Sequence, residues 1–261
     1  MTKIITFSAS KGGVGKTTMT FNFGAYLNKQ GYSVLLIDSD YQGNLSSTYG
    51  VYSSTNTLFD VFTGGQPKIR QINDQLSILP ASPNLDQLEA LLQGRNNQNF
   101  LMLMWLQDHA ELVNHYDFVL IDTHPEFGTL TKNMIAISDH VIVPLEPSEY
   151  GFVQSKSQFE IRFKEFQADA VDIRTRVSLI DAQVHYLANR VKFNTRSSRE
   201  FASIIADLDD VVATIYEREL FNASTMLKTP IFELKTDNKK ALAEIENAFV
   251  KLLESVKADE L

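Results

Sequence analysis

The 261-residue sequence contains no cysteine. This absence excludes disulfide bonds, thiolate zinc sites and thiolate-held iron–sulfur clusters, so any metal must be held by oxygen or histidine ligands. Only 12 glycines and 7 prolines accompany 44% hydrophobic residues, which is the composition of a globular chain with a full core. No apolar run approaches the roughly 20 residues that cross a bilayer, and no basic-then-apolar leader precedes Lys3. We therefore expect a cytoplasmic protein.

The length and the charge set further limits. A chain of 261 residues lies within the range of one large α/β domain, so we treat residues 1–261 as a single domain. The net charge of −8 argues against a protein coated in nucleic acid. A local basic patch can still bind phosphates on an acidic surface, so the position of the cations matters more than their total.

Apolar runs of strand length recur along the chain and are almost continuously hydrophobic in segments such as VLLID and FVLID. Such runs are typical of parallel strands that are covered on both faces. The sequence therefore predicts an α/β fold of the P-loop NTPase kind, a mostly parallel twisted sheet with helices on both faces. The predicted strands are Lys3–Ala9, Ser33–Asp38, Leu76–Pro80, Phe118–Asp122, His140–Pro144, Val184–Asn189 and Val211–Ile215.

Stretches with helical spacing lie between these runs. The predicted helices are Thr18–Lys29, Asn84–Gln93, Asn99–Asn114, Thr129–Ser138, Glu149–Gln167, Ser197–Asp207 and Asn238–Val256. Two stretches fit neither period. We expect a loop-rich excursion over Tyr49–Gln75 and a surface connection over Ala168–Gln183.

A glycine-rich loop separates the first predicted strand from the first predicted helix. Gly12, Gly13 and Gly15 let the backbone wrap so that successive N–H groups face one anion without a Cβ in the way. In this order of strand, loop and helix, Lys16 would reach the β- and γ-phosphates of a nucleotide and the Thr17 hydroxyl would ligate Mg²⁺. The alternative is a glycine-rich turn before a helix-capping threonine. The predicted phosphate-binding residues are Lys11, Gly12, Gly13, Val14, Gly15, Lys16, Thr17 and Thr18.

This loop departs from the ordinary pattern G-x-x-x-x-G-K-[ST], because Ser10 stands at the first glycine and Lys11 follows it. The KGG-x-GK-T form resembles the deviant Walker A motif of the ParA/MinD family of ATPases. In that family the early lysine crosses a dimer interface and contacts the nucleotide of the partner subunit. The resemblance implies ATP as the ligand, a sandwich homodimer formed with ATP, and a catalytic role for Lys11 beside Lys16. Without it, a lysine in a loop would usually be only solvated.

Two carboxylates follow the second predicted strand in the segment D-x-D-x-Q-G-N, which begins at Asp38. The carboxyl ends of parallel strands are where ligands bind in an open sheet. The segment resembles the first switch of the same family. The resemblance implies that Asp40 orients or activates the attacking water and that Asp38 supports magnesium and its waters. The alternative is a pair of carboxylates that cap the next helix.

The strand FVLID ends in Asp122, as a Walker B strand does, and would place a carboxylate beside Mg²⁺. The family usually continues with two prolines after the threonine, whereas this chain reads Thr123-His124-Pro125. We interpret His124 as a neutral surface substitution in the second switch loop, although a histidine there could respond to pH or phosphate. The predicted metal-site residues are Thr17, Asp38 and Asp122.

The predicted base site comes from the second half of the chain. Asn189 follows a predicted strand and resembles the family's asparagine that hydrogen-bonds adenine, because its amide both donates and accepts. A turn-capping asparagine is the alternative. Lys228-Thr229-Pro230 resembles the segment that packs over the base, so Pro230 joins Asn189 as a predicted ATP-binding residue. The guanine-selective motif N-K-x-D is absent, which favours ATP over GTP.

Basic residues gather after Asn189 and again near the last predicted helix. In partition members of the family, basic residues from these two regions converge on the DNA-binding surface of the dimer. Such clusters bind phosphates by charge without reading bases. A solvated basic face is the alternative. The predicted DNA-binding residues are Lys192, Arg196, Arg199, Arg218, Lys228, Lys239 and Lys240.

The preferred hypothesis is a ParA-type DNA partition ATPase that acts at the nucleoid. ATP drives dimerisation, the dimer binds nonspecific DNA, and a ParB-like centromere-binding partner stimulates slow, Mg²⁺-dependent hydrolysis and releases it. No helix-turn-helix segment precedes the glycine-rich loop, so we expect no operator binding.

A second hypothesis is a MinD-like membrane-associated regulator, which needs a basic amphipathic C-terminal helix. The tail from Phe249 to Leu261 is amphipathic but ends acidic, so we expect no stable membrane association and expect its apolar residues to pack on the core. A third hypothesis, an ATP-dependent biosynthetic ligase of the same superfamily, fits Lys11 and the segment after Asp38 poorly.

Overall fold

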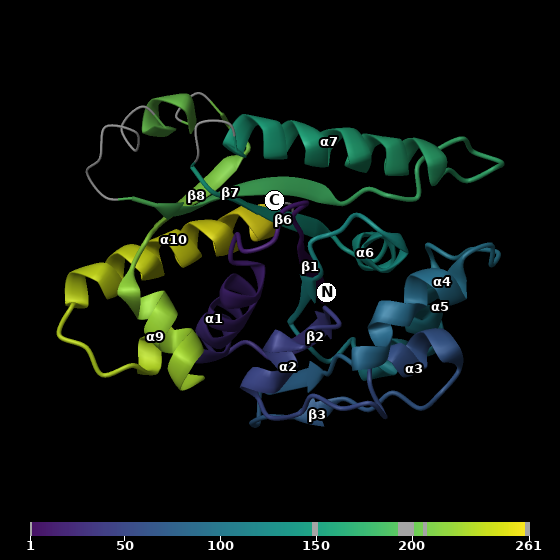
Figure 1. Cartoon of the computed structure of the whole chain (residues 1–261), viewed down its shortest axis with the longest axis horizontal. Coiled ribbons are helices and arrows are strands. Elements are labelled where there is room, and N and C mark those ends of the chain that lie inside the picture. The colour runs from purple at the N-terminus through teal and green to yellow at the C-terminus, as the bar shows by residue number, and fades with distance from the viewer. Residues whose placement is uncertain (1, 148–150, 193–200, 206–207, 259–261) are drawn as a thin grey trace.

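The computed structural model describes residues 2–147, 151–192, 201–205 and 208–258. These residues build an eight-stranded sheet with the order β3-β4-β2-β5-β1-β6-β7-β8 (Figure 1). Neighbouring strands run parallel except β3 and β4, which are antiparallel. The strands are β1 (Lys3–Phe7), β2 (Val34–Ser39), β3 (Arg70–Gln71), β4 (Leu76–Leu79), β5 (Phe118–Thr123), β6 (His140–Leu145), β7 (Gln183–Val191) and β8 (Val211–Tyr216).

The predicted α/β fold and all seven predicted strands are confirmed, as β1, β2 and β4 to β8. Strand β3 is absent from the prediction because it has only two residues, neither of them apolar. It forms an edge of the sheet beside β4. The central strands β2, β5, β1 and β6 place their carboxyl ends along one edge of the sheet, and this edge carries the candidate site.

Strand β2 shows why continuous apolar runs accompany this sheet, since all six of its residues are buried. Val34 and Leu36 pack in a core with helices α1 and α10, whereas Leu35 and Ile37 pack on the other face with α3, α4 and α5. Successive side chains of a strand point to opposite faces. A strand covered on both faces therefore needs apolar residues at consecutive positions.

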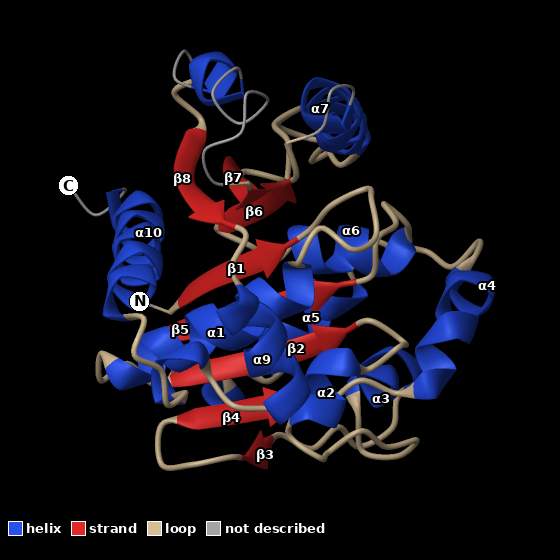
Figure 2. Ribbon diagram, turned by 60° about the vertical axis from the view of Figure 1, so that its left-hand side comes forward, coloured by secondary structure: helices blue, strands red, loops and turns tan. Residues whose placement is uncertain are grey.

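Helices cover both faces of the sheet (Figure 2). Apolar residues of α1, α9 and α10 join the core on one face, and those of α3 to α7 join the two core clusters on the other. The α-helices are α1 (Lys16–Lys29), α2 (Asn44–Thr48), α3 (Leu58–Thr63), α4 (Leu88–Leu92), α5 (Leu101–Asp108), α6 (Thr129–Ile135), α7 (Gly151–Asp169), α9 (Glu219–Leu227) and α10 (Lys239–Lys257). The 3₁₀ helices are η1 (Pro83–Gln87), η2 (Ala110–Leu112) and η3 (Ile231–Glu233), and residues 201–205 are also helical.

Several helices differ from the prediction. Helix α9 is missing from it, because α9 is short and leaves Met226 and Leu227 82% and 65% exposed, which obscures an amphipathic pattern. The predicted excursion over Tyr49–Gln75 contains α3, which begins with a capping box between Thr57 and Asp60. The predicted helix Asn99–Asn114 divides into α5 and η2. Much of the predicted helix Ser197–Asp207 lies outside the described residues.

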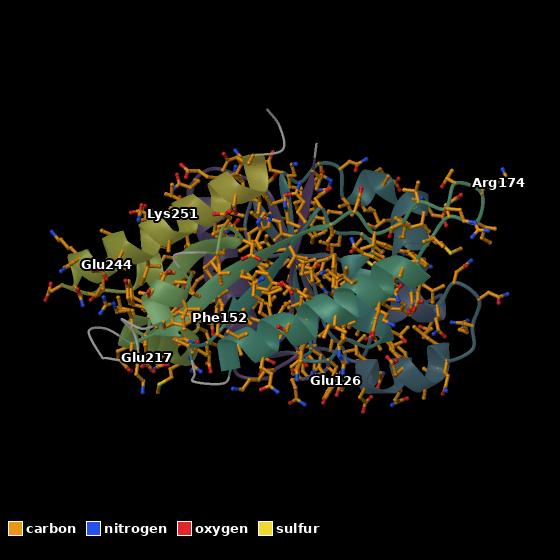
Figure 3. All side chains as sticks on the ribbon, turned by 90° about the horizontal axis from the view of Figure 1, so that it is seen from above. Glu126, Phe152, Arg174, Glu217, Glu244 and Lys251 are labelled. Atoms are coloured by element: carbon orange, nitrogen blue, oxygen red, sulfur yellow. The ribbon has the colours of Figure 1, made fainter. Side chains whose placement is uncertain are left out.

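The predicted surface connection after α7 is confirmed. An isolated bridge joins Val171 to Ser178, and the side chain of Ile173 is 89% exposed. The Asp172 carboxylate accepts hydrogen bonds from the backbone N–H groups of Arg174 and Thr175 and so fixes the turn. Figure 3 shows Arg174 at an extremity of the molecule.

The last helix packs as expected from its apolar spacing. Ile245, Phe249, Leu252 and Val256 of α10 are buried in the core that also holds α1. The hydrophobic face of this helix is therefore used within the fold. None of the described helices is long and apolar enough to cross a membrane.

Candidate functional site

The loop between β1 and α1 has the backbone that its glycines predict. Gly13 and Gly15 adopt the left-handed conformation, with φ of 80° and 94°. Gly15 caps the N-terminus of α1, and a Cβ at this position would lie 2.5 Å from Nδ2 of Asn189. Both the conformation and the close contact exclude other residues at position 15. The loop therefore presents the N-terminus of α1, where backbone N–H groups and the helix dipole favour an anion.

A cavity of about 370 Å³ opens in front of this loop. Four segments other than the loop line it: residues 40–44 after β2, 124–125 after β5, 189–190 in β7, and 216–225 in β8 and α9. Segments that are distant in sequence thus surround the N-terminus of α1. The cavity has the size of a small-ligand site, with polar groups on several walls.

The two loop lysines lie in different environments. Lys16 is only 6% exposed, and burial lowers its pKa, while the charges of Asp122 and Asp40 act in the opposite direction. Lys16 lines the cavity, whereas Lys11, near the start of the loop, is exposed to solvent. The structure therefore supplies one ammonium group inside the site and a second one outside it.

Asp38 and Asp122 lie side by side, because β2 and β5 are neighbouring strands and these two residues are paired in register. Both side chains are fully buried. The Asp38 carboxylate accepts hydrogen bonds from the backbone N–H and the hydroxyl of Ser46, both at 2.7 Å, and from the N–H of Asp40 at 3.2 Å. Burial nevertheless raises the pKa of Asp38 to about 6. Asp38 therefore organises the loop after β2.

Asp122 differs from Asp38 because both of its carboxylate oxygens are buried without a hydrogen bond of normal geometry. Burial raises its pKa well above 3.8, and the nearby charge of Asp38 adds to this effect. The Thr17 hydroxyl and the Lys16 ammonium act against the rise in pKa. An unpaired buried carboxylate is costly unless a cation or a ligand completes its surroundings.

These groups fit a magnesium site. Mg²⁺ prefers oxygen ligands and is usually held by one or two protein groups, with water and phosphate oxygens completing the octahedron. The unpaired oxygens of Asp122 and the Thr17 hydroxyl match this preference. Among the described residues, no three His, Cys, Asp or Glu side chains form a self-contained metal cluster. Asp38 is better placed to support the site than to bind the metal, because its oxygens already accept hydrogen bonds.

The raised pKa of Asp38 predicts a pH-dependent stability of the nucleotide-free protein. The unfolded chain loses this proton near 3.8, whereas the folded chain keeps it up to about 6. The stabilisation is thus complete below pH 4 and is lost as the pH rises through 6, a change of about 2 to 3 kcal/mol. We expect urea unfolding to show this loss between pH 4 and pH 7. In an Asp38→Asn variant, which keeps an acceptor for Ser46, this part of the pH dependence is absent, and equal pH profiles of the two proteins would contradict the assignment.

Asp40 lines the cavity and is 7% exposed. Its Oδ1 accepts a hydrogen bond from the backbone N–H of Gln42 at 2.9 Å. The same oxygen lies 2.9 Å from Nδ1 of His124, which also lines the cavity. His124 therefore lines the cavity and contacts Asp40, a placement that its interpretation as a neutral surface substitution did not anticipate. The only sequence signal was its departure from the proline pattern.

Asn189 and Arg190 hold the glycine-rich loop from the side of β7. Nδ2 of Asn189 donates a 2.7 Å hydrogen bond to the Val14 carbonyl, and its side chain is almost fully buried. The Arg190 guanidinium donates to the Gly13 carbonyl at 2.9 Å and to Glu146 at 2.7 Å. Asn189 thus has a contact that the sequence did not indicate, and its contact with adenine remains a prediction. Arg190 is an additional residue of the site that sequence reasoning did not single out for the loop.

Pro230 is not among the residues that line the cavity. It begins η3, and the next N–H, that of Ile231, donates to Oδ1 of Asn22 on α1 at 2.8 Å. Tyr216, Arg218 and other residues of β8, α9 and the loop between them line the cavity instead. The turn after α9 is thus held against the side of α1, and the contact of Pro230 with the base stays a prediction.

The predicted DNA-binding cations do not share one environment. Lys192, Lys239 and Lys240 are exposed. Arg218 forms an ion pair with Glu244 on α10. Lys228 donates to the Ser47 carbonyl at 2.8 Å, so its ammonium helps to join α9 to α2. Arg196 and Arg199 lie outside the described residues.

A glycine-rich loop between a strand and a helix, a buried lysine at the start of that helix, and carboxylates at adjacent strand ends define a P-loop nucleotide-binding protein. Residues 2–177 match the family model described as an AAA domain (AAA_31), and the chain belongs to this family. The resemblance to the ParA/MinD type is confirmed by relatives among partition proteins.

The chromosome partitioning protein ParA of Myxococcus xanthus is 34% identical over 162 residues, which cover 60% of this chain and 56% of that protein. The chain therefore matches little more than half the length of this relative. A protein described as a plasmid partition protein of Borrelia burgdorferi, bound to AMPPNP, superimposes with a TM-score of 0.81 at 24% identity and covers 98% of this chain and 100% of that one. Cobyrinic acid a,c-diamide synthase of Mycobacterium smegmatis, with ADP and magnesium, gives 0.77 at 25% identity and covers 99% and 97%. The fold alone does not choose between partition and biosynthesis.

Proposed function

We propose that this protein is an Mg²⁺-dependent ATPase that partitions DNA. ATP joins two copies of the chain, and the dimer binds DNA without reading its sequence. A ParB-like centromere-binding partner stimulates ATP hydrolysis, which releases the protein from the DNA. The observation that carries the ATPase part is the buried group formed by Lys16, Asp122 and Asp40 at the N-terminus of α1. The similarity to ParA supports the partition part.

The groups in the cavity supply what phosphoryl transfer to water requires. Water attacks the γ-phosphorus, the bond from phosphorus to the oxygen that bridges to the β-phosphate breaks, and ADP leaves with the electron pair. Asp40 orients the water and accepts its proton. Lys16 and the loop N–H groups stabilise the charge on the phosphate oxygens. No covalent intermediate on the protein is needed.

Mg²⁺ neutralises phosphate charge when it is bound. Thr17 and Asp122 would hold it, directly or through water, and Asp38 would fix the loop that carries Asp40. Of the described arginines, Arg190 and Arg218 line the cavity, and they are engaged with Glu146 and Glu244 respectively. Neither is therefore poised as an arginine finger, and we expect slow turnover that a partner protein accelerates.

The exposed cations supply a surface for DNA phosphates. Lys239 and Lys240 begin α10, and Lys192 follows β7. Charge contacts of this kind bind any DNA sequence, with an affinity that falls steeply as the salt concentration rises. Arg218 and Lys228 contribute less to this surface, since each already has a partner within the fold.

A MinD-like membrane-associated regulator is the alternative function. It would need an apolar helix face that is free to enter the lipid interface. The apolar face of α10 is buried in the core instead. The biosynthetic alternative is supported only by a shared fold with the amide-forming synthase, so partition remains the preferred proposal.

Sedimentation tests these proposals directly. The protein is centrifuged with plasmid DNA and with anionic liposomes, each with ATP, ADP or no nucleotide. We expect ATP-dependent pelleting with DNA and none with liposomes, because the site controls dimerisation and α10 offers no apolar face. ATP-dependent pelleting with liposomes but not with DNA would overturn the partition proposal.

A paired variant tests the surface itself. Replacing Lys239 and Lys240 together by alanine removes four lysines from each dimer, so it should weaken DNA binding by the dimer at least several-fold and reduce the magnitude of the slope of log affinity against log salt by up to about 4. The control replaces Lys68 and Lys164, which are also exposed but lie far from α10 in the sequence. Equal losses in both variants would show that only net charge matters.

A further inference from the structure

The side chain of His124 connects two loops that follow neighbouring strands of the sheet. It stands two residues beyond Asp122 at the end of β5, and its Nδ1 lies 2.9 Å from Oδ1 of Asp40, which follows β2. The histidine side chain is 20% exposed and the aspartate side chain 10% exposed. This contact therefore lies within the walls of the cavity and is largely shielded from solvent.

The imidazole is held from several sides. The ring of Tyr41 packs on it with 4.4 Å between ring centroids, and the Tyr41 carbonyl accepts a 2.6 Å hydrogen bond from the Tyr52 hydroxyl. The backbone N–H of Glu126 donates to the His124 carbonyl at 2.8 Å. Nε2 lies 3.9 Å from a carboxylate oxygen of Glu126, a side chain that is 78% exposed. Within the part of the chain that the structure describes, the one short polar contact of the ring is the contact with Asp40.

The chemistry of the acceptor sets the direction of this hydrogen bond. An ionised carboxylate only accepts, so Nδ1 carries the hydrogen and donates it to Asp40. Among the described residues, both donors to this carboxylate, the Gln42 N–H and the His124 ring, reach Oδ1. This arrangement fixes the carboxylate and leaves Oδ2 to accept a hydrogen from water.

We propose that His124 is a positioning residue for ATP hydrolysis, whose Nδ1–H holds Asp40 so that Oδ2 faces the attacking water. This inference rests on the proposed ATPase function. His124 does not touch the nucleotide in this role and takes up no proton from the reaction. Hydrolysis slows when the orientation of the carboxylate that aligns the water is not fixed, because small misplacements at a reacting centre slow the reaction.

The variants distinguish this role by the position of the donor. Asparagine places an amide N–H near the position of Nδ1, whereas glutamine places it near Nε2. We expect His124→Leu and His124→Gln to lower kcat about tenfold or more, with the Kd for ATP changed less than about twofold, and His124→Asn to keep kcat within about threefold. The control is His115→Leu, because His115 is exposed and does not line the cavity.

A double variant tests whether His124 acts through Asp40. In an Asp40→Asn background, adding His124→Leu should reduce the residual rate no further, because the group that it positions is already disabled. If His124→Leu folds poorly, as judged by circular dichroism, the comparison of the asparagine and glutamine variants decides. Equal kcat in these two variants, or a full additional loss in the Asp40→Asn background, would overturn the positioning role. If the unsubstituted protein hydrolyses ATP and the His124 variants have the same kcat, this inference alone is overturned. If the unsubstituted protein binds ATP but does not hydrolyse it, the proposed function is overturned as well.

Discussion

Replacing Asp40 by alanine is expected to lower kcat for ATP hydrolysis by at least about 100-fold, while ATP binding persists and the proposed ATP-bound dimer accumulates. The size of the effect follows from the loss of the group that orients and deprotonates water, a contribution of roughly 10²- to 10⁴-fold. Asp40 is buried in the wall of the cavity, and two donors fix its carboxylate. Its removal leaves Lys16 and the glycine-rich loop in place, so the affinity for ATP should change little. Steady-state phosphate release and equilibrium binding of a fluorescent ATP analogue measure the two quantities.

The matched control for this variant is Asp74→Ala, which removes the same charge from an exposed turn. It should leave kcat unchanged. Size-exclusion chromatography with ATP then reports the dimer, which should persist for longer in Asp40→Ala than in the unchanged protein. Normal hydrolysis by Asp40→Ala would show that another group activates the water and would refute the assignment of Asp40.

We expect that replacing Lys11 by alanine weakens the proposed ATP-dependent dimer at least about 30-fold. Lys11 is exposed in the single chain, unlike Lys16, so its ammonium is available to the nucleotide of a second copy. A charge that becomes desolvated against phosphate at an interface typically costs 2 to 5 kcal/mol when it is removed, which is roughly 30- to several thousand-fold in affinity. Sedimentation velocity with ATP and the Asp40→Ala background measures the dimer without loss of nucleotide.

The control for Lys11 is Lys29→Ala, which removes a lysine from the far end of α1, where it lies 3.9 Å from Glu246. It should not affect dimerisation. ATP should still bind to Lys11→Ala monomers, because Lys16 and Thr17 are retained. Dimers of equal affinity in Lys11→Ala and in the unchanged protein would remove the cross-subunit role and with it the sandwich arrangement.

The order of strand, loop and helix around the phosphate loop could be predicted because each element has a local cause. Gly13 and Gly15 permit positive φ, and the sequence itself indicates that the next helix begins near Lys16. Asp38 and Asp122 could be assigned to one edge of the sheet because each ends an apolar strand, and the carboxyl ends of parallel strands meet there. These features depend on local conformation and on hydrophobic periodicity, which a sequence contains.

The contacts between distant segments could not be predicted in the same way. His124 and Asp40 are 84 positions apart, and Asn189 and Val14 are 175 apart, so neither pair leaves a local pattern. The turn that Pro230 begins is tied to Asn22 on α1 through the Ile231 N–H, a contact that its resemblance to a base-binding segment did not indicate. Only the packing of helices on the sheet decides which loops meet at its edge.

The sequence by itself thus determined a P-loop protein, with its phosphate loop and strand-end carboxylates, because those features follow from backbone freedom and apolar periodicity. The tertiary structure decided the environment of each group. It buried Lys16 and left Lys11 exposed, it left the oxygens of Asp122 unpaired, and it brought His124 against Asp40. Burial and charge are properties of the assembled surroundings, and the same residue type therefore takes different roles at different depths in the fold.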